Sequence, residues 1–100
     1  MEITVNKTSE STILEVSGRL DTTTAPAFEA QVKEYFNKTK LLILDIKNVE
    51  YISSAGLRVV LQAHKGMGAY SGKLIVKNPS DFCQQVFEAT GMDSILFIEK

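Results

Sequence analysis

The chain has 100 residues, of which 44% are hydrophobic and 23% are charged, and this composition is typical of a single folded domain rather than a disordered or fibrous protein. Eleven basic against twelve acidic residues give a formal net charge of −1, and no block of lysines and arginines marks a surface for nucleic acid. The longest apolar runs, such as residues 41–44, are far shorter than the ~20 residues of a membrane span, and the N-terminus is unlike a signal peptide, so we expect one cytoplasmic domain over residues 1–100.

The first third of the chain predicts a β-hairpin followed by a helix. Apolar and polar residues alternate from Ile3 to Val5, and the pattern resumes at residue 13 and ends at Gly18. The threonines at 22–24 offer helix caps, and Pro26 suits a first helical turn. Helical spacing then predicts one buried face made of Phe28, Val32, Tyr35 and Phe36.

The rest of the chain alternates strands with helices. Residues 40–46 are apolar without alternation, which predicts a central strand covered on both faces, and a helix follows from Ser54 to Lys65, before Gly66 and Gly68. Residues 73–77 predict a short strand, and residues 95–98 predict the last one. Between them a third helix, with Pro79 in its first turn, runs to Gly91 on an inner stripe of Phe82, Val86 and Ala89.

This order of elements determines the expected fold class. A hairpin followed by alternating helices and strands implies right-handed crossovers and parallel pairing beyond the hairpin. We therefore predict an α/β domain with a mixed five-stranded sheet that is parallel in its core. Its helices should lie mainly on one face of the sheet.

The most informative segment is residues 49–60, predicted as a loop that delivers Ser53 and Ser54 to the first turn of an apolar helix. A helix N-terminus presents unpaired N–H groups and about half a positive charge, so the amides of residues 55–57 suit a phosphate on Ser54. Gly56 would let another chain approach closely. On residue chemistry alone, either serine also fits a purely local role as the helix N-cap, for which Ser54 is the better placed.

The run Ser53-Ser54-Ala55-Gly56-Leu57 is preceded by Leu44-Asp45-Ile46 and by a Gly-Arg-Leu-Asp turn at residues 18–21, and together these resemble the STAS family of anti-sigma-factor antagonists. The resemblance covers essentially the whole chain and implies the STAS fold. It also implies that Ser54, two places before Gly56, is phosphorylated by a partner anti-sigma factor with serine kinase activity. The unphosphorylated protein would bind that partner and release a sigma factor, and a separate phosphatase would reset the switch.

The same resemblance implies where the partner binds. The family's characteristic aspartate falls on Asp21, and the expected surface joins its loop to the start of the second helix, with the residues Asp21, Thr22, Thr23, Thr24, Ser53, Ser54, Ala55, Gly56, Leu57 and Arg58. No cofactor is expected, because ATP and magnesium would belong to the kinase. The family's aspartate before the phosphorylated serine is replaced by Ser53, which keeps an alternative open: a STAS subunit that binds another assembly, such as a lipid-transport ATPase, without phosphorylation.

An enzymatic function is not expected. A hydrolase triad would combine Ser54, His64 and an acid such as Asp21. Ten residues along one helix, however, would place His64 ~15 Å from Ser54 along the axis, against ~3 Å for a hydrogen bond. His64 is instead expected to be a partly buried or capping residue near the helix end. We predict no catalytic residues and no metal ligands.

Two further patterns have simple structural interpretations. Glycines between Gly66 and Gly72 superficially suggest a dinucleotide-binding fingerprint, but the run leads from a helix into a strand, whereas that motif leads from a strand into a helix. We predict a flexible helix-exit loop there. The single Cys83 cannot form an internal disulfide and is expected to be a small buried helix residue.

Overall fold

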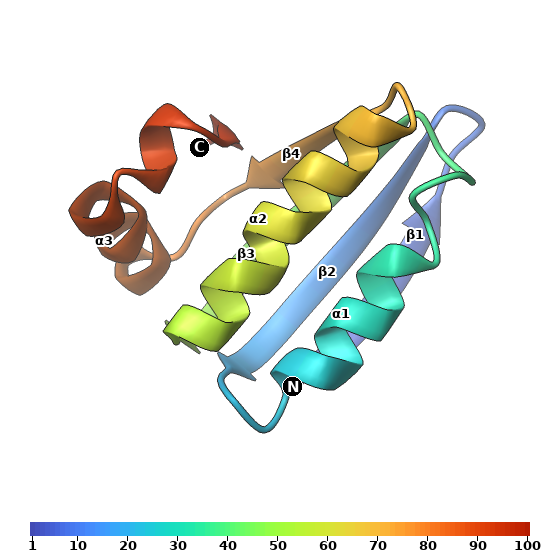
Figure 1. The fold of residues 1–100 in the computed structure, drawn as a ribbon. Helices are drawn as coiled ribbons and strands as arrows, with labels where there is room; N and C mark the ends of the chain where they lie inside the picture. Colours follow the sequence, from blue (N-terminus) through green and yellow to red (C-terminus); the bar gives the residue numbers. More distant parts are fainter.

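Five strands and three α-helices follow one another in the expected order in the computed structural model, which describes residues 1–100 (Figure 1). None of the helices combines the length and the apolar composition of a membrane-crossing helix. The elements are β1 (Glu2–Lys7), β2 (Ser11–Leu20), α1 (Ala25–Lys33), β3 (Leu41–Ile52), α2 (Ser54–Ala69), β4 (Lys73–Lys77), α3 (Asp81–Thr90), the 3-10 turn η1 (Met92–Ser94) and β5 (Phe97–Glu99).

The strands form one sheet in the order β1-β2-β3-β4-β5. β1 pairs antiparallel with β2, and every other neighbouring pair is parallel. The predicted α/β class and the mixed sheet with a parallel core are therefore confirmed. β3 is the middle strand, as expected from its apolar sequence.

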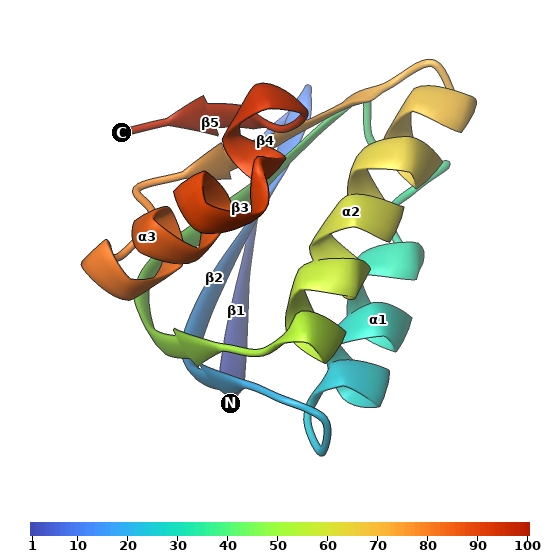
Figure 2. The same cartoon turned by 60° about the vertical axis from the view of Figure 1, so that its left-hand side comes forward.

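The two faces of the sheet differ in burial. Leu14, Leu44 and Val76 are in register on one face, and each is at most 1% exposed. α1 and α2 lie side by side against this face, as Figures 1 and 2 both show. On the opposite face, residues such as Ile43 and Asp45 are only partly buried. The prediction that the central strand is covered on both faces is therefore wrong, because these helices cover one face only.

α3 lies beside the C-terminal half of β3, away from α1 and α2 (Figure 2). Pairing between β3 and β4 ends at Asp45, although β3 continues to Ile52, so the edge of β3 beyond that point has no strand partner. The Ser80 hydroxyl donates to the Val49 carbonyl at 2.6 Å and accepts from the Cys83 amide at 3.3 Å. Ser80 therefore supplies a hydrogen-bond donor to the Val49 carbonyl on this unpaired edge and also caps α3.

Cys83 is buried with no exposed surface, as expected for a small helix residue, and its thiol also lies 3.9 Å from the Val49 carbonyl. The predicted inner stripe of α3 is wrong. Cys83 and Phe87 are the buried residues, whereas Phe82 is 40% exposed. The contact of Ser80 and Cys83 with β3 sets the rotation of the helix, and the predicted stripe is displaced by one residue from the observed one. Pro79 precedes the cap instead of lying in the first turn.

Two element ends were misplaced because packing overrides local signals. β3 runs on through residues 47–52, so most of the predicted loop before Ser53 is strand. α2 continues through Gly66 and Gly68 to Ala69, so the predicted helix-exit loop is helical over these residues. A Cβ at Gly66 would clash with the Phe36 ring, and this glycine therefore permits close packing instead of ending the helix.

Three other ends differ by a few residues. β2 passes through Gly18, whose φ of 92° is tolerated by glycine, and ends at Leu20. α1 ends at Lys33, and the buried Tyr35 lies in the turns that follow. β5 begins at Phe97, because the amides of Ile95 and Leu96 still donate to the Met92 carbonyl of the 3-10 turn η1.

Candidate functional site

The loops that follow β2 and β3 lie together because the two strands end level. Glu15 pairs with Asp45 and Leu20 pairs with Ile52. Between these two pairs β3 advances by seven residues and β2 by five. Register shifts along this stretch absorb the difference. The Ser53 amide then donates to the Leu20 carbonyl at 2.8 Å, which ties the start of one loop to the end of the neighbouring strand.

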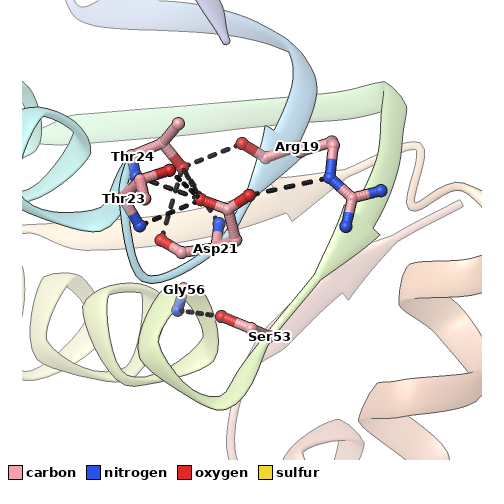
Figure 3. Close-up of polar contacts among 6 residues, drawn as sticks. All are labelled: Arg19, Asp21, Thr23, Thr24, Ser53 and Gly56. Atoms are coloured by element: carbon pink, nitrogen blue, oxygen red, sulfur yellow. Dashed lines mark hydrogen bonds and ion pairs between the residues drawn. The ribbon is translucent and has the colours of Figure 1, made fainter.

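The first loop is organised by the Asp21 carboxylate (Figure 3). Its Oδ1 accepts from the Thr23 hydroxyl at 2.7 Å, from the Thr23 amide at 3.0 Å and from the Thr24 amide at 3.1 Å. The Thr24 hydroxyl accepts from the Asp21 amide at 2.9 Å and donates to the Arg19 carbonyl at 2.8 Å. Thr24 is the N-cap residue of α1 by position but makes no side-chain cap bond. The carboxylate therefore holds the turn that precedes α1, and the expectation that a threonine side chain caps the helix is wrong.

These bonds lower the pKa of Asp21. The Thr23 hydroxyl is the largest cause and the Thr24 amide the next, and together they hold the pKa of the Asp21 carboxyl below its ordinary value of 3.8. Arg19 Nε lies 3.6 Å from the other carboxylate oxygen. Asp21 is therefore a carboxylate at neutral pH, fixed at the surface by its own turn.

The two serines have different roles. The Ser53 hydroxyl accepts from the Gly56 amide at 3.4 Å, so Ser53 is the N-cap of α2 (Figure 3). Ser54 is the first residue of the helix, its side chain is exposed, and its hydroxyl makes no hydrogen bond within the protein. The expectation that Ser54 caps the helix is wrong, because the extended backbone of Ser53 directs that side chain to the amide instead.

The amides after Ser54 are only partly available. The Gly56 amide donates to the Ser53 hydroxyl, and the Leu57 amide donates to the Ser53 carbonyl at 2.8 Å. Two of the three N–H groups that were expected to suit a phosphate are therefore engaged inside the turn. The helix N-terminus still presents the positive end of its dipole to Ser54.

Gly56 is buried, and its role lies within the chain. A Cβ at this position would lie 2.7 Å from the Leu20 carbonyl oxygen and 2.9 Å from the Leu20 Cβ. The glycine therefore lets α2 approach the end of β2, and the expected close approach of another chain does not involve it. Ala55 and Leu57 pack partly against the core, whereas Arg58 is exposed.

The surface shared by the two loops is polar. Its most exposed members are Thr22, Thr23, Ser54 and Arg58, while Asp21, Thr24 and Ser53 are partly exposed. We call this set the two-loop surface. It presents hydroxyl groups, one carboxylate and one guanidinium group.

A row of side chains that the sequence interpretation missed continues this surface toward α3. The Arg19 guanidinium, which is also the ion-pair partner of Asp21, lies 4.2 Å from the centroid of the Tyr51 ring. Tyr51 in turn lies 5.2 Å from the Phe82 ring, measured between centroids. Extending the strand alternation past Gly18 would have found Arg19, but the contact with Phe82 depends on where α3 packs.

His64 lies on α2, ten residues after Ser54, and the helix continues beyond it. It is partly buried, as expected, but it lies in the helix interior and not at its end. Its ring is 5.7 Å from Phe97, and its Nδ1 is buried without a hydrogen-bond partner. His64 and Ser54 are not brought together. No group of three or more His, Cys, Asp or Glu side chains is arranged to hold a metal ion.

Comparison with known proteins identifies the family. A family model described as the STAS domain matches residues 2–100. The chain is 32% identical over 96 residues to BtrV of Bordetella bronchiseptica, a candidate anti-sigma factor antagonist, and the match covers 95% of this chain and 83% of that protein. It is 31% identical over 85 residues to the anti-sigma-B factor antagonist of Listeria monocytogenes, covering 84% and 75% of the two chains.

Solved structures share the fold. The anti-sigma factor antagonist SpoIIAA in its unphosphorylated form matches with a TM-score of 0.82 at 20% identity, covering 99% of this chain and 89% of that chain. The Bacillus protein SpoIIAA in its phosphorylated form matches with a TM-score of 0.77 at 20% identity, covering 99% and 92%. With the family model matching nearly every residue and the five-stranded fold in agreement, the chain belongs to the STAS domain family.

Proposed function

We propose that this protein is an anti-sigma factor antagonist whose binding to an anti-sigma factor is switched off by phosphorylation of Ser54. The observation that carries the proposal is the exposed Ser54 hydroxyl, which has no partner within the chain and stands at a helix N-terminus beside the Asp21 loop. The names of the related proteins from Bordetella and Listeria support the class of function.

Phosphorylation at this position would change the charge of the two-loop surface without a need to change the fold. A phosphate adds about −1.5 to −2 charges at neutral pH. In the monomer the group would stand in solvent, near the positive end of the α2 dipole. A partner packed against the same turn would have to desolvate it next to the Asp21 carboxylate, so the cost falls on the complex.

The relatives of known structure support the view that phosphate penalises the complex and not the fold of the monomer. SpoIIAA has been solved in both unphosphorylated and phosphorylated forms, and this chain matches both folds. A STAS fold therefore accommodates phosphate in that protein without losing its architecture.

The chemistry of the switch would belong to the partners. The anti-sigma factor would act as the serine kinase and bring ATP and magnesium, and a phosphatase would remove the phosphate. The protein itself would contribute the hydroxyl and the binding surface. Because such partners control transcription, the protein would act in the bacterial cytoplasm.

The test uses the purified protein and an anti-sigma factor kinase encoded in the same genome. Phosphorylation with ATP is mapped by mass spectrometry, and affinity is measured by calorimetry before and after modification. Ser54→Ala should bind without being switched, and Ser54→Asp should bind poorly. Ser53→Ala is the matched control and should still be phosphorylated.

A penalty of about 3 kcal/mol on the complex would weaken binding more than a hundredfold. Phosphate found on Ser53, or full affinity retained with phosphate on Ser54, would overturn the proposal. Binding of a different assembly by a protein that no kinase modifies would instead favour the alternative, a STAS subunit that works without phosphorylation.

A further inference from the structure

A cavity of about 610 Å³ lies at the end of the sheet opposite Ser54. It is open to solvent and is lined by the turn between β1 and β2 and by the connection from α1 to β3, which Figure 1 shows side by side at that end. None of its lining residues belongs to the two-loop surface. Any role of this cavity is therefore separate from the proposed switch.

The charge of the lining is positive. Lys7, Lys38 and Lys40 all line the cavity, and none of them forms a salt bridge. Glu10 is the single carboxylate of the lining. Lys7 Nζ lies 5.6 Å from the centroid of the Tyr35 ring, so one of the ammonium groups is held against an aromatic face. Three unpaired cations against one anion favour an anionic occupant.

Two residues that carry hydroxyl groups and are mostly buried also line the cavity. Thr12 is 4% exposed and Tyr35 is 7% exposed, and both belong to the lining. Neither hydroxyl makes a hydrogen bond within the chain. The only fully buried side-chain atoms without a hydrogen bond are His64 Nδ1 and Gln84 Oε1, so both hydroxyl oxygens keep some exposed surface. What remains exposed of these side chains therefore includes hydroxyl oxygens that can bond to an occupant of the cavity. Thr12 is also the only buried polar residue of the protein.

We infer that this cavity binds the phosphate group of a small phosphorylated molecule. Ammonium groups and hydroxyl donors are among the side chains that bind phosphate oxygens, and hydrogen bonds to an anion are stronger than those between neutral groups. The volume falls within the range of about 300–1,000 Å³ that is typical of small-molecule sites. A concave site with three lysines differs from the extended basic stripe of a nucleic-acid surface.

The test measures binding by the full chain with two methods. Calorimetry and amide chemical shifts are recorded with adenosine monophosphate, with glucose 6-phosphate and with inorganic phosphate, at low ionic strength. Saturable binding should move the amide signals of residues 7–12 and 38–41. Tighter binding of either organic phosphate than of inorganic phosphate identifies a metabolite as the ligand, and equal binding identifies free phosphate.

Substitutions of lining residues test whether the phosphates bind in this cavity. Lys38→Gln and Lys40→Gln should each weaken binding about tenfold, because each removes a charge-assisted hydrogen bond. Thr12→Val keeps the shape and should also weaken binding, while Lys65→Gln, an exposed lysine on α2 outside the cavity, should leave affinity unchanged. All four variants are checked for an unchanged fold by circular dichroism.

Three outcomes would overturn the inference. These are no saturable binding of any of the three phosphates, an equal loss of affinity in Lys65→Gln, and tighter binding of an RNA oligonucleotide than of the mononucleotide. The last two would mean that the lysines act as general surface charge.

Discussion

The Ser53 amide donates a 2.8 Å hydrogen bond to the Leu20 carbonyl, and this bond joins the start of α2 to the end of β2. Asp21 follows the acceptor residue and Ser54 follows the donor residue. The two loops of the candidate site are therefore held together by backbone at their first residues. A side chain that disturbs this junction should affect both loops at once.

Gly56 should not tolerate a side chain. The Cβ of Gly56→Ala would lie 2.7 Å from a backbone oxygen of Leu20, which cannot rotate away, and such overpacking costs about 1–3 kcal/mol. Gly68→Ala is the matched control on the same helix, because a Cβ there meets nothing within 4 Å. It should stabilise the protein by about 0.5–1 kcal/mol through helix propensity. Denaturant unfolding of both variants measures the difference, and equal stabilities would contradict the packing role of Gly56.

The two serines should differ in stability as well as in modification. Ser53→Ala removes the N-cap of α2 and should cost about 0.5–1 kcal/mol, at the low end of the usual range because the bond to the Gly56 amide is 3.4 Å long. Ser54→Ala removes a hydroxyl with no partner and should change stability by less than about 0.5 kcal/mol. Thermal unfolding distinguishes them. A larger loss for Ser54→Ala would show that Ser54 is the cap.

The free energy of unfolding at acidic pH should depend on the Asp21 carboxylate. Its pKa is lower in the folded protein than the ordinary 3.8, so its stabilising contribution is complete above that value and is lost as the pH falls through the lowered pKa. Thr23→Val removes the largest cause and should raise the pKa of Asp21 toward 3.8. Thr22→Val is the control, since Thr22 is exposed and makes no hydrogen bond to the carboxylate. Carboxyl titration by NMR checks both, and an unmoved pKa in Thr23→Val would show that the hydroxyl is not the cause.

Cys83 should react slowly with thiol reagents in the native protein. Burial raises the pKa of its thiol above the ordinary 9.0, and the thiolate is the reactive form. Labelling should therefore be slow at pH 8 and rapid once denaturant unfolds the chain. A Cys83→Ala protein that carries Ser94→Cys at an exposed position provides the rapidly labelled native control. Native Cys83 reacting as fast as that control would show that α3 opens readily from β3.

A charge placed on the two-loop surface should weaken partner binding without unfolding the domain. Thr22→Lys is the suitable variant, because Thr22 is exposed and lies outside the hydrogen bonds that hold the Asp21 turn. Lys65→Gln, remote on α2, is the control. Calorimetry with the anti-sigma factor should show at least a tenfold loss for Thr22→Lys alone. Unchanged affinity would remove the Asp21 loop from the interface.

Phe82 illustrates why part of the candidate surface was beyond prediction. Periodicity assigns an apolar residue at helical spacing to the core, yet Phe82 is 40% exposed and its ring lies at a tilt, 5.2 Å from the Tyr51 ring between centroids. Two apolar stripes one residue apart on a helix fit the pattern equally well, and the contact of Ser80 with Val49, 31 residues earlier, selects between them. Such a choice has no local signal.

Local patterns were sufficient for the order of the elements, the parallel core of the sheet and the position of two hydroxyls at the start of α2. Alternation and helical spacing report which side chains must be buried, and these depend on near neighbours in the chain. The ends of β3, the continuation of α2 through Gly66 and the assignment of the cap to Ser53 depend on partners far away in the chain. Strand pairing with Leu20 and packing against Phe36 supply those partners, and they exist only once the chain has folded.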